Sequence, residues 1–174
     1  MIGDVLVSSI LCNSLKKAYP NARIDYLVYE STTPVIEGNP NIDTVILFKN
    51  KHRTSSTKLL KLAWRIRKEK YDIIIDAYSK LESWVLVFLS GAKRRISYKK
   101  PGRSFLYTDN VPLISFPKTN LGLAIERRLS LLKPLNLNIE IDPHPKLFMT
   151  EMEIKSTIKL FEEFGVIDNR KTIM

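Results

Sequence analysis

The sequence lacks the residues that several common kinds of site require. Its one cysteine, Cys12, excludes an internal disulfide framework and a cysteine-rich zinc site, and is typical of a reducing compartment. We interpret it as a small apolar residue on a helix. His144 stands between two prolines with no second histidine or cysteine at ligand spacing, so we expect no metal. A glycine-rich phosphate loop, a nucleophile elbow and an HExxH motif are also missing, and we expect no cofactor.

Long apolar segments are missing as well. No apolar run approaches the roughly 20 residues that span a bilayer. The first fifteen residues are apolar, but Asp4 stands where a signal peptide would have basic residues, and Asn13 and Ser14 interrupt the run. We therefore expect a cytoplasmic protein.

Acidic residues are scarce in the middle of the chain. The net charge is +10, and residues 49–103 hold 16 Lys and Arg against 4 Asp and Glu. Such an excess can attract nucleic acid, an anionic membrane surface or a phosphorylated substrate, and charge alone does not choose among them. Alternatively, most of these basic residues lie on the solvent-exposed faces of helices and bind no partner.

What is present indicates an alternating α/β protein of one domain. Helical spacing of apolar residues predicts helices over 5–18, 58–70, 81–89, 120–135 and 150–164, the last with a capping box from Thr150 to Glu153. Residues rich in β-formers predict strands over 23–29, 44–48, 71–76 and 94–98. Residues 73–75 are continuously β-branched, as in a parallel strand covered on both faces. We predict a doubly wound parallel sheet, with Trp64 and Trp84 packing on helices.

Several strings of the sequence, in the same order along the chain, carry a resemblance to a known family. They are residues 2–6 (IGDVL), 15–22 (LKKAYPNA), 39–43 (NPNID), 70–76 (KYDIIID), 91–96 (GAKRRI) and the pair Glu126-Arg127. Together they resemble the amino-terminal domain of glycosyltransferase family 9, the lipopolysaccharide heptosyltransferases. The match covers nearly the whole chain.

The resemblance implies a Rossmann-like domain that is the amino-terminal, acceptor-side half of a GT-B glycosyltransferase. We expect this domain to cover residues 1–168, and residues 169–174 to begin a carboxyl-terminal donor-binding domain. The family's first strand precedes the Gly-Asp pair, so we also expect that strand to be missing here. By this interpretation the chain is a truncated product that is inactive alone.

Asp4 matches the general base of the family, which removes a proton from the acceptor hydroxyl. Spacing alone favours a helix-capping role for Asp4, whereas the ordered family match favours the base. Gly3 matches a tight turn that lets substrate approach, and a plain turn glycine is the alternative. Asp76 ends a strand, where such folds bind ligands, and it can equally cap the next helix. The chain departs from the family after Asp76, where it has Tyr78-Ser79.

Basic residues are the remaining substrate-binding candidates. Lys51 and Arg53 lie in the loop after a predicted strand, from which they can reach acceptor phosphates. Arg94, Arg95 and Arg103 are similar candidates. For each of them a solvated surface charge is the more common role, and the cluster argues for phosphate binding better than any one member.

The sequence thus predicts an inverting, metal-independent transfer of heptose from ADP-heptose to the anionic lipopolysaccharide core, with peripheral contact at the inner membrane. Two alternatives remain. One is a non-catalytic basic module that binds anionic lipid or nucleic acid, although no recognisable nucleic-acid module is present. The other is a non-functional remnant.

Overall fold

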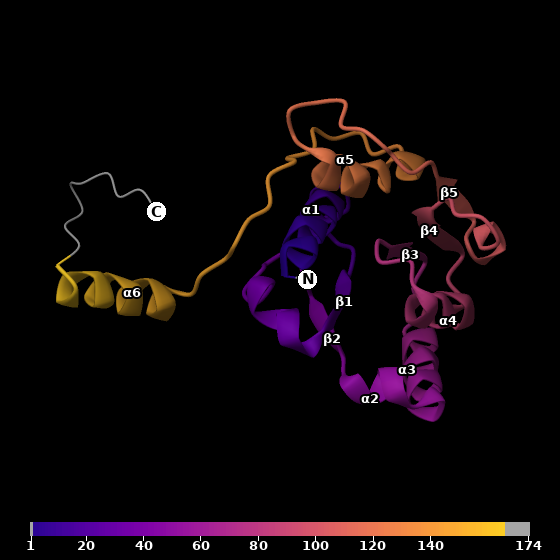
Figure 1. Cartoon of the computed structure of the whole chain (residues 1–174), viewed down its shortest axis with the longest axis horizontal. Coiled ribbons are helices and arrows are strands. Elements are labelled where there is room, and N and C mark those ends of the chain that lie inside the picture. The colour runs from indigo at the N-terminus through magenta and orange to yellow at the C-terminus, as the bar shows by residue number, and fades with distance from the viewer. Residues whose placement is uncertain (1, 166–174) are drawn as a thin grey trace.

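The computed structural model describes residues 2–165 and contains five parallel strands (Figure 1). Strand β1 (Asp25–Tyr29) pairs with β2 (Thr44–Phe48) over their full length. Strand β3 (Ile73–Asp76) pairs with β4 (Arg94–Tyr98), and β4 pairs with β5 (Asp109–Val111). The expected α/β class with parallel strands is confirmed.

The strands form two sheets, β1-β2 and β3-β4-β5, where the sequence had suggested one. Strands β1 and β3 meet through side chains at both of their ends. The Tyr71 hydroxyl, before β3, donates to the Asp25 carboxylate at the start of β1. At the other end the hydroxyls of Tyr29 and Tyr78 lie 3.3 Å apart. These side-chain contacts hold β1 and β3 together although no backbone hydrogen bonds pair the two strands. The spacing of apolar residues along a strand does not indicate which strand it pairs with, so the sequence could not distinguish two sheets from one.

The described residues also form six α-helices. They are α1 (Ile2–Ala18), α2 (Asn50–Thr54), α3 (Ser56–Lys68), α4 (Leu81–Ser90), α5 (Leu123–Ser130) and α6 (Glu151–Glu163). Helix α1 packs on α5, and α3 packs on α4. Short 3-10 helices occupy Glu30–Val35, Ser104–Leu106 and Lys133–Leu135.

Three elements differ from the sequence prediction. The helix expected over 120–135 ends at Ser130, and the chain continues as a 3-10 turn containing Pro134, which has no N–H to donate. Helix α2 and strand β5 were not predicted, because five and three residues are too few to show a period. The start of a donor-binding domain expected at 169–174 lies outside the described residues.

Two apolar clusters hold the layers together. One contains Ile96 and Leu131, both fully buried, and joins β4 to α1 and to the segment after α5. The other joins β2 to α3 and α4 through Phe48, Leu62 and Leu86. The capping box of α6 is present, with Thr150 Oγ1 accepting from Glu153 N, but α6 is exposed along its length and lies apart from these clusters in Figure 1.

Burial makes the single thiol a sensitive probe of folding. Cys12 is 4% exposed, and burial raises the pKa of its thiol to about 12. Because the thiolate is the reactive form, a disulfide reagent added to the native protein near neutral pH should label Cys12 only when the chain opens. We expect slow labelling in buffer and rapid labelling of one thiol in denaturing urea. Rapid labelling of the native protein would contradict this packing of α1.

A second prediction concerns acid stability. Arg94 Nη2 donates to Asp109 Oδ1 over 2.8 Å, and this hydrogen bond lowers the pKa of the Asp109 carboxyl. The Arg94–Asp109 pair therefore stabilises the folded state fully above the unfolded-state carboxyl pKa of about 3.9. This stabilisation is lost as the pH falls through the lower pKa of the folded state. The wild-type urea midpoint should drop as the pH falls from about 4 towards 2, and less steeply for D109N. Equal slopes for the two proteins would show that this pair contributes nothing.

Candidate functional site

Asp4 lies in the first turn of α1 with its side chain half exposed. Arg128 of α5 reaches it, with Nη2 3.6 Å from Asp4 Oδ1. The same guanidinium donates from Nε to Ser8 Oγ over 2.7 Å and from Nη1 to the Tyr98 hydroxyl over 3.0 Å. Three elements, α1, β4 and α5, therefore fix the cation that faces the Asp4 carboxylate, while the carboxylate itself stays accessible.

Gly3 does not form the tight turn that the sequence suggested. It lies inside α1, which begins at Ile2, and it is not among the glycines with positive φ. A Cβ added at Gly3 would meet nothing within 4 Å. The turn is therefore wrong for this chain, since helical dihedrals suit any residue, and a substrate contact at Gly3 stays a prediction.

Asp76, at the carboxyl end of β3, is buried at 5% exposure and fully engaged within the chain. Its Oδ1 accepts from the backbone N–H groups of Tyr78 and Ser79, over 3.1 Å and 2.7 Å. Its Oδ2 accepts from Ser83 Oγ over 2.8 Å and from the Tyr107 hydroxyl over 2.7 Å. Burial raises the pKa of Tyr107, and the nearby Asp76 charge adds to this. Asp76 thus organises the loop that leads into α4, but it does not cap this helix, whose N-cap is Lys80.

Cations gather on this loop. Lys100 Nζ donates to the Ser79 carbonyl over 3.2 Å, and Lys80 Nζ lies 4.7 Å from the centre of the Tyr78 ring. Ser79 holds a left-handed conformation with φ of 49°, which is uncommon for a residue other than glycine. The hydrogen bonds to Asp76 and Lys100 stabilise this conformation, so the carboxyl end of β3 presents a shaped, basic loop.

A hollow of about 410 Å³ opens at the carboxyl ends of β1 and β2. Tyr29 and Phe48 line it, as does Arg53 from helix α2, which was not predicted. Arg53 Nε is 3.7 Å from Glu82 Oε1, and the Arg53 side chain stays mostly exposed while that of Glu82 is partly buried. Lys51 lies on the same helix and is exposed. Burial and the neighbouring cation Lys51 lower the pKa of His52, so a neutral imidazole is favoured here.

The remaining candidates fall on different edges. Arg103 follows β4 and lies 4.0 Å over the Trp84 ring, on the side of the strands' carboxyl ends. Arg94 and Arg95 begin β4 and therefore lie at the opposite edge from Asp76. Arg94 is held there by Asp109 and by the Pro134 carbonyl, 2.9 Å away. The structure brings Arg53, Asp76 and Arg103 to one edge and does not bring Arg94 and Arg95 there.

Sequence reasoning missed Arg128 and Tyr107, which contact two of the predicted residues. The Glu126-Arg127 pair pointed to the right helix, but its side chains shape the preceding loop. Glu126 accepts from Lys118 N and Thr119 N, and Arg127 Nε donates to the Ile114 carbonyl. No spacing rule links Arg128 to Asp4, since 124 positions separate them. Within residues 2–165, no cluster of three His, Cys, Asp or Glu side chains is placed to hold a metal.

Because four donors converge on Asp76, we expect D76N to be one of the most damaging single changes at this edge. The asparagine side chain would place an NH2 group against hydrogen-bond donors. Each lost hydrogen bond to a charged acceptor lowers the free energy of unfolding by about 1.5–3 kcal/mol. Urea unfolding should show a loss of at least about 2 kcal/mol, against less than about 0.5 kcal/mol for D72N, an exposed aspartate on the same segment. A loss no larger than that of D72N would disprove the role of Asp76 as the organising acceptor.

No helix among the described residues is long and apolar enough to cross a membrane. No protein-family model matches the sequence. Two curated proteins from Escherichia coli, both named lipopolysaccharide heptosyltransferase 3, are 33% and 30% identical to the chain over 144 and 145 residues. These alignments cover 78% of this chain but only 41% and 40% of the relatives, so the chain spans less than half their length.

Solved structures agree on the fold. A family 9 glycosyltransferase from Veillonella parvula superposes with a TM-score of 0.76 at 22% identity, covering 97% of this chain and 48% of that protein. Escherichia coli ADP-heptose heptosyltransferase II gives 0.71 at 20% identity, with 97% and 49% covered. The sequence and fold comparisons together confirm the resemblance: over most of its length this chain is similar to the amino-terminal part of the family 9 lipopolysaccharide heptosyltransferases.

Proposed function

We propose that this chain is the acceptor-side part of a glycosyltransferase that transfers heptose from ADP-heptose to the lipopolysaccharide inner core. The 33% identity to lipopolysaccharide heptosyltransferase 3 is the observation that carries the proposal. The exposed carboxylate of Asp4 beside a fixed arginine supports it. The acceptor-side domain covers residues 1–168 in this proposal, and residues 169–174 begin the donor-binding part.

Asp4 acts as the general base. Its carboxylate takes the proton of the acceptor hydroxyl while that oxygen attacks the anomeric carbon of the heptose, and ADP leaves from the opposite face, so the configuration inverts. The side chain is half exposed, which lets a hydroxyl come within hydrogen-bond distance. Arg128 limits the directions that the carboxylate can take. No metal is required, because cationic side chains can offset the phosphate charges of the reactants.

The anionic acceptor binds at the carboxyl ends of the strands. Arg53 borders the hollow there, and Lys51 and Arg103 extend the positive surface along the same edge. Asp76 contributes by shaping the loop between β3 and α4, with both carboxylate oxygens already engaged. Gly3 beside Asp4 offers a surface without a side chain. Arg94 and Arg95 can contact only a part of the acceptor that extends to the opposite edge.

In this proposal the donor binds mainly to the part of the relatives that this chain does not match. Escherichia coli heptosyltransferase WaaC has been solved with ADP and with ADP-2-deoxy-2-fluoro heptose, and this chain covers only 48% and 49% of those chains. The chain alone should therefore bind acceptor without turnover. Because the acceptor is a membrane lipid, the protein works in the cytoplasm in peripheral contact with the inner membrane.

The transfer is testable in a chimera in which this chain replaces the matching region of Escherichia coli lipopolysaccharide heptosyltransferase 3. We expect transfer from ADP-heptose, with D4N lowering kcat about 10²- to 10⁴-fold at little change in acceptor KM, the range for losing a general base. D72N, at an exposed aspartate that pairs with Lys93, is the matched control and should keep full activity.

Two results would contradict the proposal. A chimera that folds but transfers no heptose would show that this chain does not supply an acceptor side. A D4N chimera with unchanged kcat would show that Asp4 is not the base. Separately, heptose transfer by the purified 174-residue chain at a normal rate would contradict the need for a donor-binding part.

A further inference from the structure

An exposed apolar surface runs over α3 and α4. On α3, Leu60 and Trp64 are 44% and 61% exposed, one helical turn apart, so the expected packing of Trp64 is wrong. On α4, Leu81 and Phe88 are 65% and 57% exposed. Phe105, in the 3-10 helix that packs against α4, is 75% exposed. We call this surface the α3–α4 face.

The two helices that carry these side chains pack against each other. Arg67 of α3 also reaches α4. Arg67 Nη1 donates to the Leu89 carbonyl on α4 over 3.1 Å, while its guanidinium lies 5.9 Å from the Trp64 ring. Arg67 therefore lies between Trp64 on α3 and the last turn of α4.

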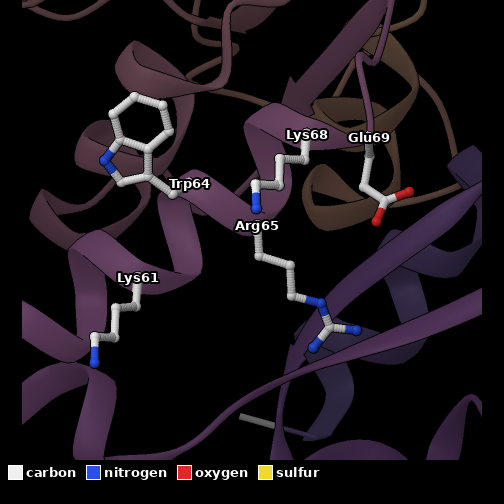
Figure 2. A pocket seen from close by; sticks show the side chains of 5 residues that line it. All are labelled: Lys61, Trp64, Arg65, Lys68 and Glu69. Carbon is white, nitrogen blue, oxygen red and sulfur yellow. The ribbon is translucent and has the colours of Figure 1, made fainter.

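The charged residues of α3 all have one sign. Helix α3 contains five cationic residues and no Asp or Glu between Ser56 and Lys68. Figure 2 shows Lys61, Trp64, Arg65 and Lys68 around a shallow hollow on the helix, with Glu69 at its far end. Glu69 is neutralised by Arg23, whose Nη1 lies 2.8 Å from Glu69 Oε2. The cations of α3 consequently act on whatever approaches from solvent.

We propose that the α3–α4 face docks on an anionic phospholipid bilayer. A helix with Trp, Phe or Leu among Lys and Arg lies in the plane of the headgroups, where the rings enter the interface and the long cationic side chains reach lipid phosphates. Each such cation near an anionic surface adds to the attraction. Phosphate contacts with nucleic acid would use the cations but leave Leu81 and Phe88 without a role.

Helix α6 is the rival membrane-binding element, and its charge argues against it. It also exposes apolar residues, including Ile158 and Phe161, at 52% and 51%. However, it carries four glutamates and two lysines, a net charge of −2, which anionic lipid repels. The proposal refines the peripheral membrane contact of the proposed function, and its test uses vesicles without lipopolysaccharide, so its failure leaves the transferase proposal intact.

The test uses the full chain and vesicles of phosphatidylcholine with or without phosphatidylglycerol. We expect co-sedimentation only with the anionic vesicles, weakened by salt. The pair K61E/R65E should weaken binding roughly tenfold or more, since each cation near an anionic surface contributes about 1 kcal/mol. The pair W64S/F88S should weaken it as well. K17E/K133E, which makes the same change of charge outside this face, should bind like the wild type, and circular dichroism confirms that each variant is folded.

A second measurement locates the contact directly. In W84F, Trp64 is the only tryptophan, and its emission should shift to shorter wavelength on anionic vesicles and stay unchanged on neutral ones. The proposal is overturned by wild-type vesicle binding in W64S/F88S, by loss of binding in I158S/F161S instead, or by an unshifted Trp64 spectrum. Tighter binding to duplex DNA than to anionic vesicles, insensitive to W64S, would assign the face to nucleic acid.

Discussion

The carboxyl edge of the second sheet depends on one buried carboxylate. Asp76 receives two backbone N–H groups from the loop that follows β3, a hydroxyl from the start of α4 and a hydroxyl from Tyr107, which precedes β5. A charge buried to this degree is tolerated only when its hydrogen bonds are satisfied. The loop conformation, the start of α4 and the position of Tyr107 are therefore coupled, and Lys80, Lys100 and Arg103 all lie on the segments that Asp76 fixes.

Much of this fold could be predicted from local sequence. The β-branched residues 73–75 marked β3, and the apolar spacing of Leu59, Leu62 and Ile66 marked α3, because both patterns record which face is buried. The capping box at Thr150 was visible for the same local reason. What the patterns could not supply were contacts between distant segments. The contact between the two sheets depends on Tyr71 with Asp25 and on Tyr29 with Tyr78, pairs separated by 46 and 49 positions.

The residues of the candidate site also fall into those that local sequence could predict and those that it could not. Asp4 could be found from its match to a family motif, and Asp76 from its place at the end of a strand, since both properties are local. The arginine that faces Asp4 could not, because Arg128 is brought there by the packing of α5 on α1. Gly3 shows the opposite error: the motif suggested a turn, whereas the chain continues a helix through it. A motif identifies which residues to examine, and only the structure says which partners they have.

The basic residues illustrate why a charge excess alone does not define a partner. Arg94 is bound to Asp109 and the Pro134 carbonyl, and Arg128 to Ser8 and Tyr98, so these two cations act within the fold. The cations on the outer side of α3 instead surround an exposed tryptophan. Cations with internal acceptors stabilise the protein, and cations grouped around exposed apolar side chains create a surface that is both positive and hydrophobic. An anionic bilayer can bind both the positive charge and the apolar side chains of such a surface, whereas a free phosphate can bind only the positive charge. The distribution of the arginines and lysines is therefore more informative about the partner than their number.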